Sequence, residues 1–149
     1  NEQGRRKRLM SQTLAIIKPD AVGAGKAGKI LALLEDRGFS VKSLKLTTLS
    51  QEQAGAFYAV HEGRPFYDEL VEFMTSGPVI PIVLEADDAV AGLREAIGAT
   101  DPAEAAQGTV RQLYAESKGR NAIHASDSDE NAAIEIAFFF SQHERLGVG

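Results

Sequence analysis

The stretch from Asn121 to Ser128, NAIHASDS, combines residue types that could carry out phosphoryl transfer. His124 stands at the end of a predicted short strand, just before a predicted helix start. An imidazole has an ordinary pKa near ~6.5, so at neutral pH it is mostly unprotonated and can act as a nucleophile. Helix N-termini also favour phosphate anions. His124 is therefore a candidate nucleophile, although a lone histidine more often has a structural part.

Candidate phosphate ligands lie in other parts of the chain. Cations and hydroxyls stabilise the charge of a transferring phosphoryl group. The residues of these types near predicted strand ends or in a long predicted loop are Lys18, Arg94, Thr100 and Arg111. None of them is specific by itself, because surface cations are usually only solvated. Glu135 follows His124 by eleven residues, and this spacing alone leaves open whether the two side chains meet.

A second phosphate motif is only approximate. The segment VGAGKAGKI, residues 22–30, contains the P-loop pattern of Gly, four residues, Gly and Lys. A P-loop continues with Ser or Thr, whose hydroxyl ligates magnesium, but the residue here is Ile30. Ile30 also belongs to the apolar stripe of a predicted helix, so packing explains it. We therefore expect the glycines to form a turn before a helix, and a P-loop ATPase is the less favoured reading.

The hydrophobic pattern predicts an α+β sandwich of four strands and flanking helices. Strands are expected at 13–17, 39–49, 79–84 and 121–125, and helices at 26–37, 50–58, 65–76, 88–97 and 127–140. Residues 100–120 are expected to form a long loop with short helical pieces, and loops of this length are usually functional.

Several local signals mark the ends and irregularities of these elements. Gly38 is placed to end the first helix, and Ser50 with Gln53 resembles a capping box. Asp87 or Asp88 is expected to cap the helix that follows the third strand. A change of alternation near Ser43 predicts a bulge. Pro81 lies inside the third strand and cannot donate to a ladder, so we expect a bulge or an unpaired position there.

Composition indicates one globular domain. The chain has 149 residues and no cysteine, which excludes disulfides, thiolate zinc sites and cysteine nucleophiles. No stretch approaches the ~20 apolar residues of a membrane span. The net charge is −5, yet residues 5–8 are all basic. We interpret residues 1–9 as a disordered or non-native extension, and residues 10–149 as a single domain. The alternative is a basic arm for nucleic acid or an acidic membrane.

Four blocks, in order, resemble the nucleoside diphosphate kinase family. They are TLAIIKPDAV at 13–22, FYAVHEGRPFYDELVEFMTSGPV at 57–79, IGATDPAEAAQGTVRQLYA at 97–115 and NAIHASDS at 121–128. The resemblance extends from about residue 10 to residue 140. It implies a ferredoxin-like βαββαβ sandwich with a four-stranded antiparallel sheet flanked by helices. It also implies a cytoplasmic homo-oligomer, either a tetramer or a hexamer. No membrane and no required nucleic acid are expected as partners.

The resemblance also assigns roles to residues. His124 would be phosphorylated, Glu135 and Ser126 would orient its ring, and Phe66 would stack on the base. The residues that would hold the phosphates and sugar hydroxyls are Lys18, Tyr58, Arg94, Thr100, Arg111 and Asn121. Mg²⁺ would be carried by the nucleotide phosphates, with Asp127 at most nearby through water.

The implied reaction moves the terminal phosphoryl group of a nucleoside triphosphate to His124 and then to a nucleoside diphosphate. Ping-pong kinetics and broad base specificity are expected. The chain departs from the usual pattern at Ala125, where glycine is commoner, and at Asp68 and Glu69, which make the base-side rim more acidic. The alternative hypothesis is a non-catalytic ferredoxin-like module that binds small ligands or RNA.

Overall fold

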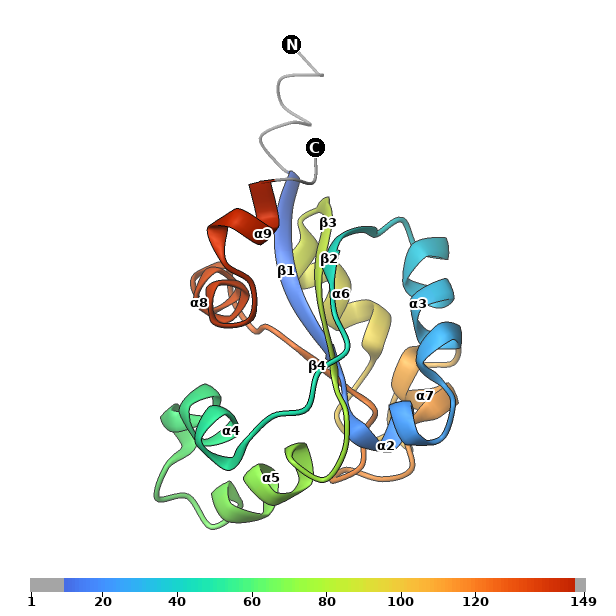
Figure 1. Ribbon diagram of the computed structural model, residues 1–149. Coiled ribbons are helices and arrows are strands. Elements are labelled where there is room, and N and C mark those ends of the chain that lie inside the picture. The colour runs from blue at the N-terminus through green and yellow to red at the C-terminus, as the bar shows by residue number, and fades with distance from the viewer. Residues whose placement is uncertain (1–9, 147–149) are drawn as a thin grey trace.

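The computed structural model of the protein describes residues 10–146, which form an antiparallel four-stranded sheet covered by helices (Figure 1). The strands are β1 Met10–Ile17, β2 Ser40–Leu44, β3 Ile80–Asp87 and β4 Ile123–Ala125. Their order across the sheet is β2-β3-β1-β4. The expected α+β ferredoxin-like sheet is confirmed. The extension expected at residues 1–9 lies outside the described residues.

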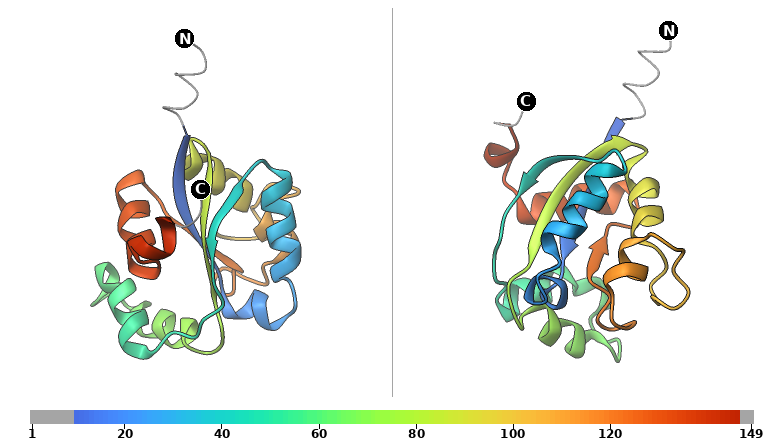
Figure 2. Two further views of the ribbon diagram at one scale, coloured as in Figure 1. Left: turned by 45° about the horizontal axis from the view of Figure 1, so that its top comes forward. Right: turned by 90° about the vertical axis from the view of Figure 1, so that its right-hand side faces the viewer.

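The helices occupy both faces of the sheet (Figures 1 and 2). In chain order they are α2 Pro19–Gly23, α3 Ala27–Asp36, α4 Gln51–Phe57, the 3₁₀ turn η1 Ala59–His61, α5 Tyr67–Met74, α6 Ala89–Ile97, α7 Val110–Tyr114, α8 Asp129–Phe139 and α9 Gln142–Leu146. Among the described residues, none of the helices has both the length and the apolar character needed to cross a membrane.

The central strand β1 separates two hydrophobic cores, because side chains alternate between the faces of a strand. Ala15 and Ile17 pack in the core that contains residues of α3 and α6. Leu14 and Ile16 pack in the other, with residues of α4, α5 and α8. All four side chains are fully buried. The uninterrupted apolar run of β1 therefore reflects a strand covered on both sides.

Most of the local signals correspond to observed features. Ser50 accepts from the Gln53 amide, and the Gln53 side chain accepts from the Ser50 amide, which completes the capping box. Gly38 follows α3 with a φ of 96°. The β2–β3 register shifts between Val41 and Ser43, as a bulge there predicts. Of the glycines in the near P-loop, Gly25 lies in the turn before α3 with a φ of 74°, while Gly23 ends α2 and Gly28 lies in α3, so the expected turn before a helix is confirmed for Gly25 alone.

Pro81 is paired on one side of its strand and lies beyond the end of the ladder on the other side, where its carbonyl still accepts from the Lys45 amide at 3.3 Å. It pairs in register with Ile16 of β1. On its other side, the ladder to β2 ends at the Leu44–Ile82 pair and resumes only as a single bridge between Thr47 and Val79. Proline lacks an N–H, so the break lies where that donor would be needed.

Two sequence expectations about helix starts were wrong. Asp88 precedes α6, but its φ of 48° leaves its side chain without a capping bond, and the Ala89 amide donates to Ser11 Oγ instead. Helix α8 begins at Asp129, not near 127, because Ser128 is its N-cap and accepts from the Asn131 amide. The short helix α2 was not expected at all, since the Lys-Pro-Asp sequence was read only as the end of a strand.

Candidate active site

His124 lies on β4 with its ring held from one side. Its Nε2 is 2.7 Å from Glu135 Oε1, and Ser126 Oγ donates to the same oxygen at 2.8 Å. Glu135 comes from α8, which packs against β1 beside β4. An ionised carboxylate can only accept, so this contact places the ring proton on Nε2 and the lone pair on Nδ1. The sequence spacing could not show this contact, and the structure makes it.

Aromatic side chains support the imidazole from behind. The rings of Phe57 and Tyr58 meet it edge to face, with centroid distances of 5.4 Å and 6.2 Å. Tyr58 is buried, and its hydroxyl has no hydrogen-bond partner among the described residues. Burial, followed by the negative charge of Glu135, raises the pKa of Tyr58, so the phenol stays protonated. The ring of His124 is thus fixed in orientation by packing as well as by Glu135.

Two arginines bind the backbone on either side of His124. Arg111 donates to the carbonyl of Ile123 at 2.8 Å and to the carbonyl of Gly98 at 3.1 Å. Arg94 donates to the carbonyl of Ala125 at 3.4 Å. Burial, and then the nearby charge of Arg94, lowers the pKa of Arg111 to about 10, which still leaves it charged at neutral pH. The cations predicted from sequence therefore flank the candidate nucleophile.

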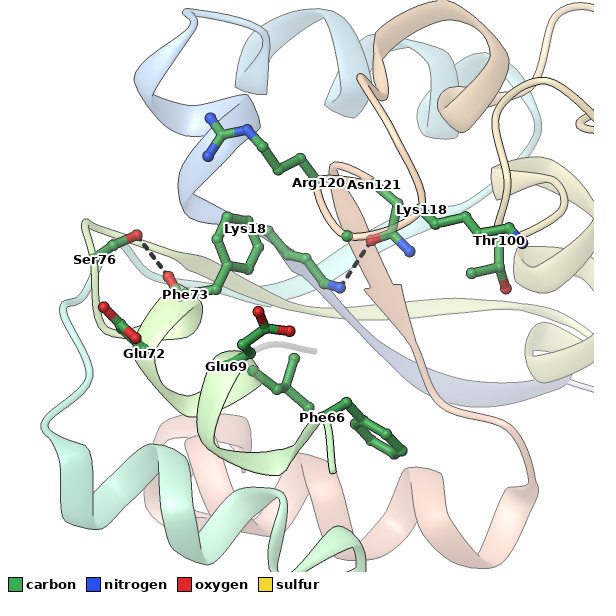
Figure 3. Close-up of a pocket in the computed structure, with 12 residues that line it drawn as sticks. Lys18, Phe66, Glu69, Glu72, Phe73, Ser76, Thr100, Lys118, Arg120 and Asn121 are labelled. Carbon is green, nitrogen blue, oxygen red and sulfur yellow. Dashed lines mark hydrogen bonds between the residues drawn. The ribbon is translucent and has the colours of Figure 1, made fainter. Parts of the chain in front are cut away.

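Lys18 adds a third cation at the point where β1 ends. The side chain is buried, and its Nζ donates to Asn121 Oδ1 at 2.8 Å (Figure 3). Burial, and then the charge of Arg111, lowers the pKa of Lys18 to about 8, while the charge of Asp20 opposes both effects. The Lys18 ammonium is therefore a buried charge whose side-chain partner is a neutral amide oxygen.

A cavity of about 780 Å³ opens beside these residues. Figure 3 shows Phe66 and Glu69 on the α5 side and Lys118 and Asn121 on the opposite side. A second cavity of about 580 Å³ contains Arg94 and Arg111 in its lining. Thr100 lines both. The two hollows thus place an aromatic wall at one end and guanidinium groups at the other, although His124 itself lines neither.

Asp127 lies three residues after His124, between β4 and α8. Its Oδ1 accepts from Asn131 Nδ2 at 2.7 Å, and this bond is the main reason that the pKa of Asp127 is lowered. Arg94 and His124 contribute less to the same effect. Within residues 10–146, no group of three or more His, Asp or Glu side chains could hold a metal ion.

Sequence reasoning missed three residues that help to form the site. Phe57 contacts the His124 ring, and Lys118 lines the larger cavity. Asp20 accepts from the amide of Ala122, two residues before His124. The only available signal for Asp20 was its position directly after Lys18-Pro19. Phe57 and Lys118 carry no signal, because an aromatic in a helix and a lysine in a loop are ordinary.

Comparison with known proteins decides the family. A family model described as nucleoside diphosphate kinase matches residues 11–145. The chain belongs to the nucleoside diphosphate kinase family. The nucleoside diphosphate kinase of Chlorobaculum parvum is 59% identical over 139 residues, covering 93% of this chain and 99% of that protein. That of Chlamydia felis is 57% identical over 135 residues, covering 91% and 96%.

Solved structures of nucleoside diphosphate kinases share the fold. The enzyme of Aquifex aeolicus has a TM-score of 0.89 at 50% identity, covering 91% of this chain and 99% of that one. The enzyme of Halobacterium salinarum, solved in complex with CDP, has a TM-score of 0.86 at 41% identity, covering 90% of each chain. Family membership confirms the expected kinase activity, and it disfavours the non-catalytic binding module.

Proposed function

We propose that this nucleoside diphosphate kinase transfers the terminal phosphoryl group between nucleotides through Nδ1 of His124. In the first half-reaction the Nδ1 lone pair attacks the terminal phosphorus of a nucleoside triphosphate. A P–N bond forms while the bond from phosphorus to the bridging oxygen breaks, and the diphosphate leaves with that electron pair. In the second half-reaction a terminal oxygen of another nucleoside diphosphate attacks the same phosphorus, and His124 is restored.

Glu135 has the orienting role in this scheme. It accepts a hydrogen bond from Nε2–H, which keeps the Nδ1 lone pair available, and its charge stabilises the positive character of the ring as the P–N bond forms. Ser126 donates to the same carboxylate oxygen and so helps to fix its position. No proton has to be removed from His124 before attack, since the attacking nitrogen is the unprotonated one.

Lys18, Arg94 and Arg111 are proposed to bind the phosphates. Their charges would stabilise the phosphoryl oxygens and the leaving diphosphate in a partly desolvated site. Asn121 and Thr100 would add hydrogen bonds to sugar hydroxyls or phosphates. The supporting observation is that Arg111 and Arg94 already bond to the residues on either side of His124. Tyr58 is the weakest member of the proposed set, because its hydroxyl is buried.

Base recognition is proposed to rest on stacking. Phe66 is 45% exposed and lines the larger cavity. Every base has a flat face, and base–aromatic stacking contributes about 1–3 kcal/mol without reading the hydrogen-bonding edge. Broad base specificity follows, with the affinity coming mainly from the phosphates.

Mg²⁺ is proposed to arrive with the nucleotide. It would screen the phosphate charge when bound, and it prefers phosphate oxygens and water as ligands, with Asp127 at most nearby through water. The enzyme is also proposed to be a cytoplasmic homo-oligomer, a tetramer or a hexamer, with residues 10–149 as its single domain and nucleoside tri- and diphosphates as its substrates.

One labelling experiment tests the role of His124. The enzyme is incubated with Mg²⁺ and ATP labelled in its terminal phosphate, and acid-labile label on the protein is measured. We expect the wild type to be labelled and GDP to remove the label, whereas His124→Gln should not be labelled. His143→Gln, which changes an exposed histidine on α9, is the matched control and should be labelled normally. Equal labelling of His124→Gln would refute the assignment.

A further inference from the structure

Ala122 holds an unfavourable backbone conformation two residues before His124. Its φ is 74°, in the left-handed region that residues with a Cβ rarely adopt. The Ile123 amide donates to the Asn121 carbonyl at 2.9 Å, so Ala122 is the central residue of a γ-turn. Conformations of this kind cost of order 1–3 kcal/mol and persist only where surrounding contacts hold them.

Both backbone polar groups of Ala122 are held by residues at the junction of β1 and α2, where Lys18 follows β1 and Asp20 lies in the first turn of α2. Its amide donates to Asp20 Oδ2 at 3.0 Å, and its carbonyl accepts from the Lys18 amide at 2.9 Å. Ala122 is fully buried, so water does not replace either bond. Contacts from residues about a hundred positions earlier therefore fix the turn.

Within residues 10–146, the Asp20 side chain makes one hydrogen bond, the one to the Ala122 amide. Asp20 is 7% exposed, and its second oxygen, Oδ1, is buried without a hydrogen-bond partner among these residues. A buried carboxylate is costly, and here its hydrogen bond goes to the strained turn. The charge of Asp20 also opposes the lowering of the Lys18 pKa.

The turn connects residues on which the proposed transfer depends. Asn121 accepts from Lys18 Nζ on one side of it, and Ile123 accepts from Arg111 on the other. If the peptide at Ala122 rotated, both bonds would shift, and His124 would move relative to the cations. We propose that Asp20 is a positioning residue that holds the Ala122 turn, and through it Asn121 and His124, in the geometry required for transfer. This inference rests on the proposed function of His124.

The test compares four variants in steady-state phosphotransfer from ATP to GDP. Asp20→Ala removes the acceptor, and we expect kcat/KM to fall about 10- to 100-fold with the loss mainly in kcat, because small misplacements of reacting groups have effects of this size. Asp20→Asn keeps an acceptor oxygen and should lose only about threefold, since one hydrogen bond is retained with less charge. Ala122→Gly removes the steric cost of positive φ. In the double variant, Ala122→Gly should therefore restore most of the kcat/KM that Asp20→Ala loses. The kcat/KM of the double variant is compared with that of the single Ala122→Gly variant.

Three results would overturn the proposal. Asp20→Ala could retain wild-type kcat, or Asp20→Asn could fall as far as Asp20→Ala, which would assign the effect to charge. The double variant could also remain as impaired as Asp20→Ala. If Asp20→Ala does not fold, recovery of folding by Ala122→Gly, measured by urea unfolding, takes the place of kinetic recovery. Steady-state rates are measured without detecting phosphohistidine. Failure of the wild type to be labelled would therefore refute the proposed role of His124, whereas the comparison of variants still shows whether Asp20 and the Ala122 turn act together.

Discussion

Lys18 and Arg111 are buried cations whose hydrogen-bond partners are neutral oxygens. Lys18 bonds to an amide oxygen, and Arg111 bonds to two backbone carbonyls. Among the described residues, neither has a carboxylate within ion-pair distance. Buried charge without an opposite charge destabilises the folded state, which is why both pKa values are lowered. An incoming polyphosphate would supply the missing negative charge. Binding would thus relieve the unfavourable free energy of burying these two cations.

The lowered pKa of Lys18 predicts how nucleotide affinity depends on pH. The pKa lies at about 8, so the ammonium is lost as the pH rises from about 7 to 9. We expect the KM for GDP to rise over this range, because neutral Lys18 no longer attracts phosphate. The measurement is KM against pH for the wild type and for Lys18→Met, whose KM should be high and insensitive to pH. A wild-type KM that stays constant between pH 7 and 9 would contradict this role.

Loss of the Lys18 charge should weaken nucleotide binding but increase the stability of the fold. The pKa is about 8 in the folded protein against 10.5 in an unfolded chain, so between these values the unfolded state binds more protons. The free energy of unfolding of the wild type relative to Lys18→Met should therefore rise with pH across this window. The full shift corresponds to an upper bound of about 3 kcal/mol. Urea unfolding of both proteins at pH 7.5 and pH 10 measures this change. An unchanged difference between the two proteins would contradict the lowered pKa of Lys18.

Elements of distant sequence meet at the site because each ends there. The C-terminal end of β1 provides Lys18, the end of α6 and the following loop provide Arg94 and Thr100, and β4 provides His124. Gly98 connects α6 to that loop with a φ of 88°, and its carbonyl accepts from Arg111. The junction at Gly98 therefore determines where both arginines lie.

A pair of glycine substitutions tests this junction. An added Cβ at Gly98 would lie 2.5 Å from Thr109 Oγ1 and 2.8 Å from Thr109 Cβ, at a φ that disfavours alanine. Gly98→Ala should reduce the free energy of unfolding by about 2 kcal/mol or more and should lower activity. Gly28→Ala is the matched control, because Gly28 lies in α3 with no atom within 4 Å of such a Cβ. It should stabilise the protein by about 0.5–1 kcal/mol and leave activity intact. Similar losses from both substitutions would contradict this explanation.

Sequence patterns predicted the elements better than their connections. The four strands, the capping box at Ser50 and the break in the ladder beside Pro81 follow from local chemistry, which periodicity and residue type record. The cap at Asp88 failed because Asp88 adopts a left-handed backbone conformation instead of the extended one that a capping residue usually has, and the sequence does not show this. In the same way, the residue blocks identified His124, but its bond to Glu135 depends on how α8 packs. The hydrogen bond from the Ala122 amide to Asp20 depends on the positive φ of Ala122, which the sequence does not show.

At the scale of the whole molecule, one edge of the sheet has apolar side chains facing outward. Strand β2 is an edge strand, and an edge strand presents unpaired backbone groups. Leu44, at its end, is 44% exposed, and Leu46, just beyond it, is 65% exposed. Exposed apolar residues beside an open edge are typical of surfaces that pair with another chain. The proposed homo-oligomer would therefore use this edge as a contact between subunits.

Mass in solution tests this contact. By light scattering we expect the wild type to have the mass of four or six copies of the 16.0 kDa chain. Leu46→Glu places a charge at the edge and should reduce the mass, while the free energy of unfolding of the separated subunit changes by only about 0.5 kcal/mol, as for other surface substitutions. Ile134→Glu is the control, since Ile134 is 68% exposed but belongs to α8 and not to the β2 edge. A monomeric wild type would refute the oligomer. A Leu46→Glu protein of unchanged mass would show that the subunits meet elsewhere, because a buried glutamate without a partner is too costly to retain in an interface.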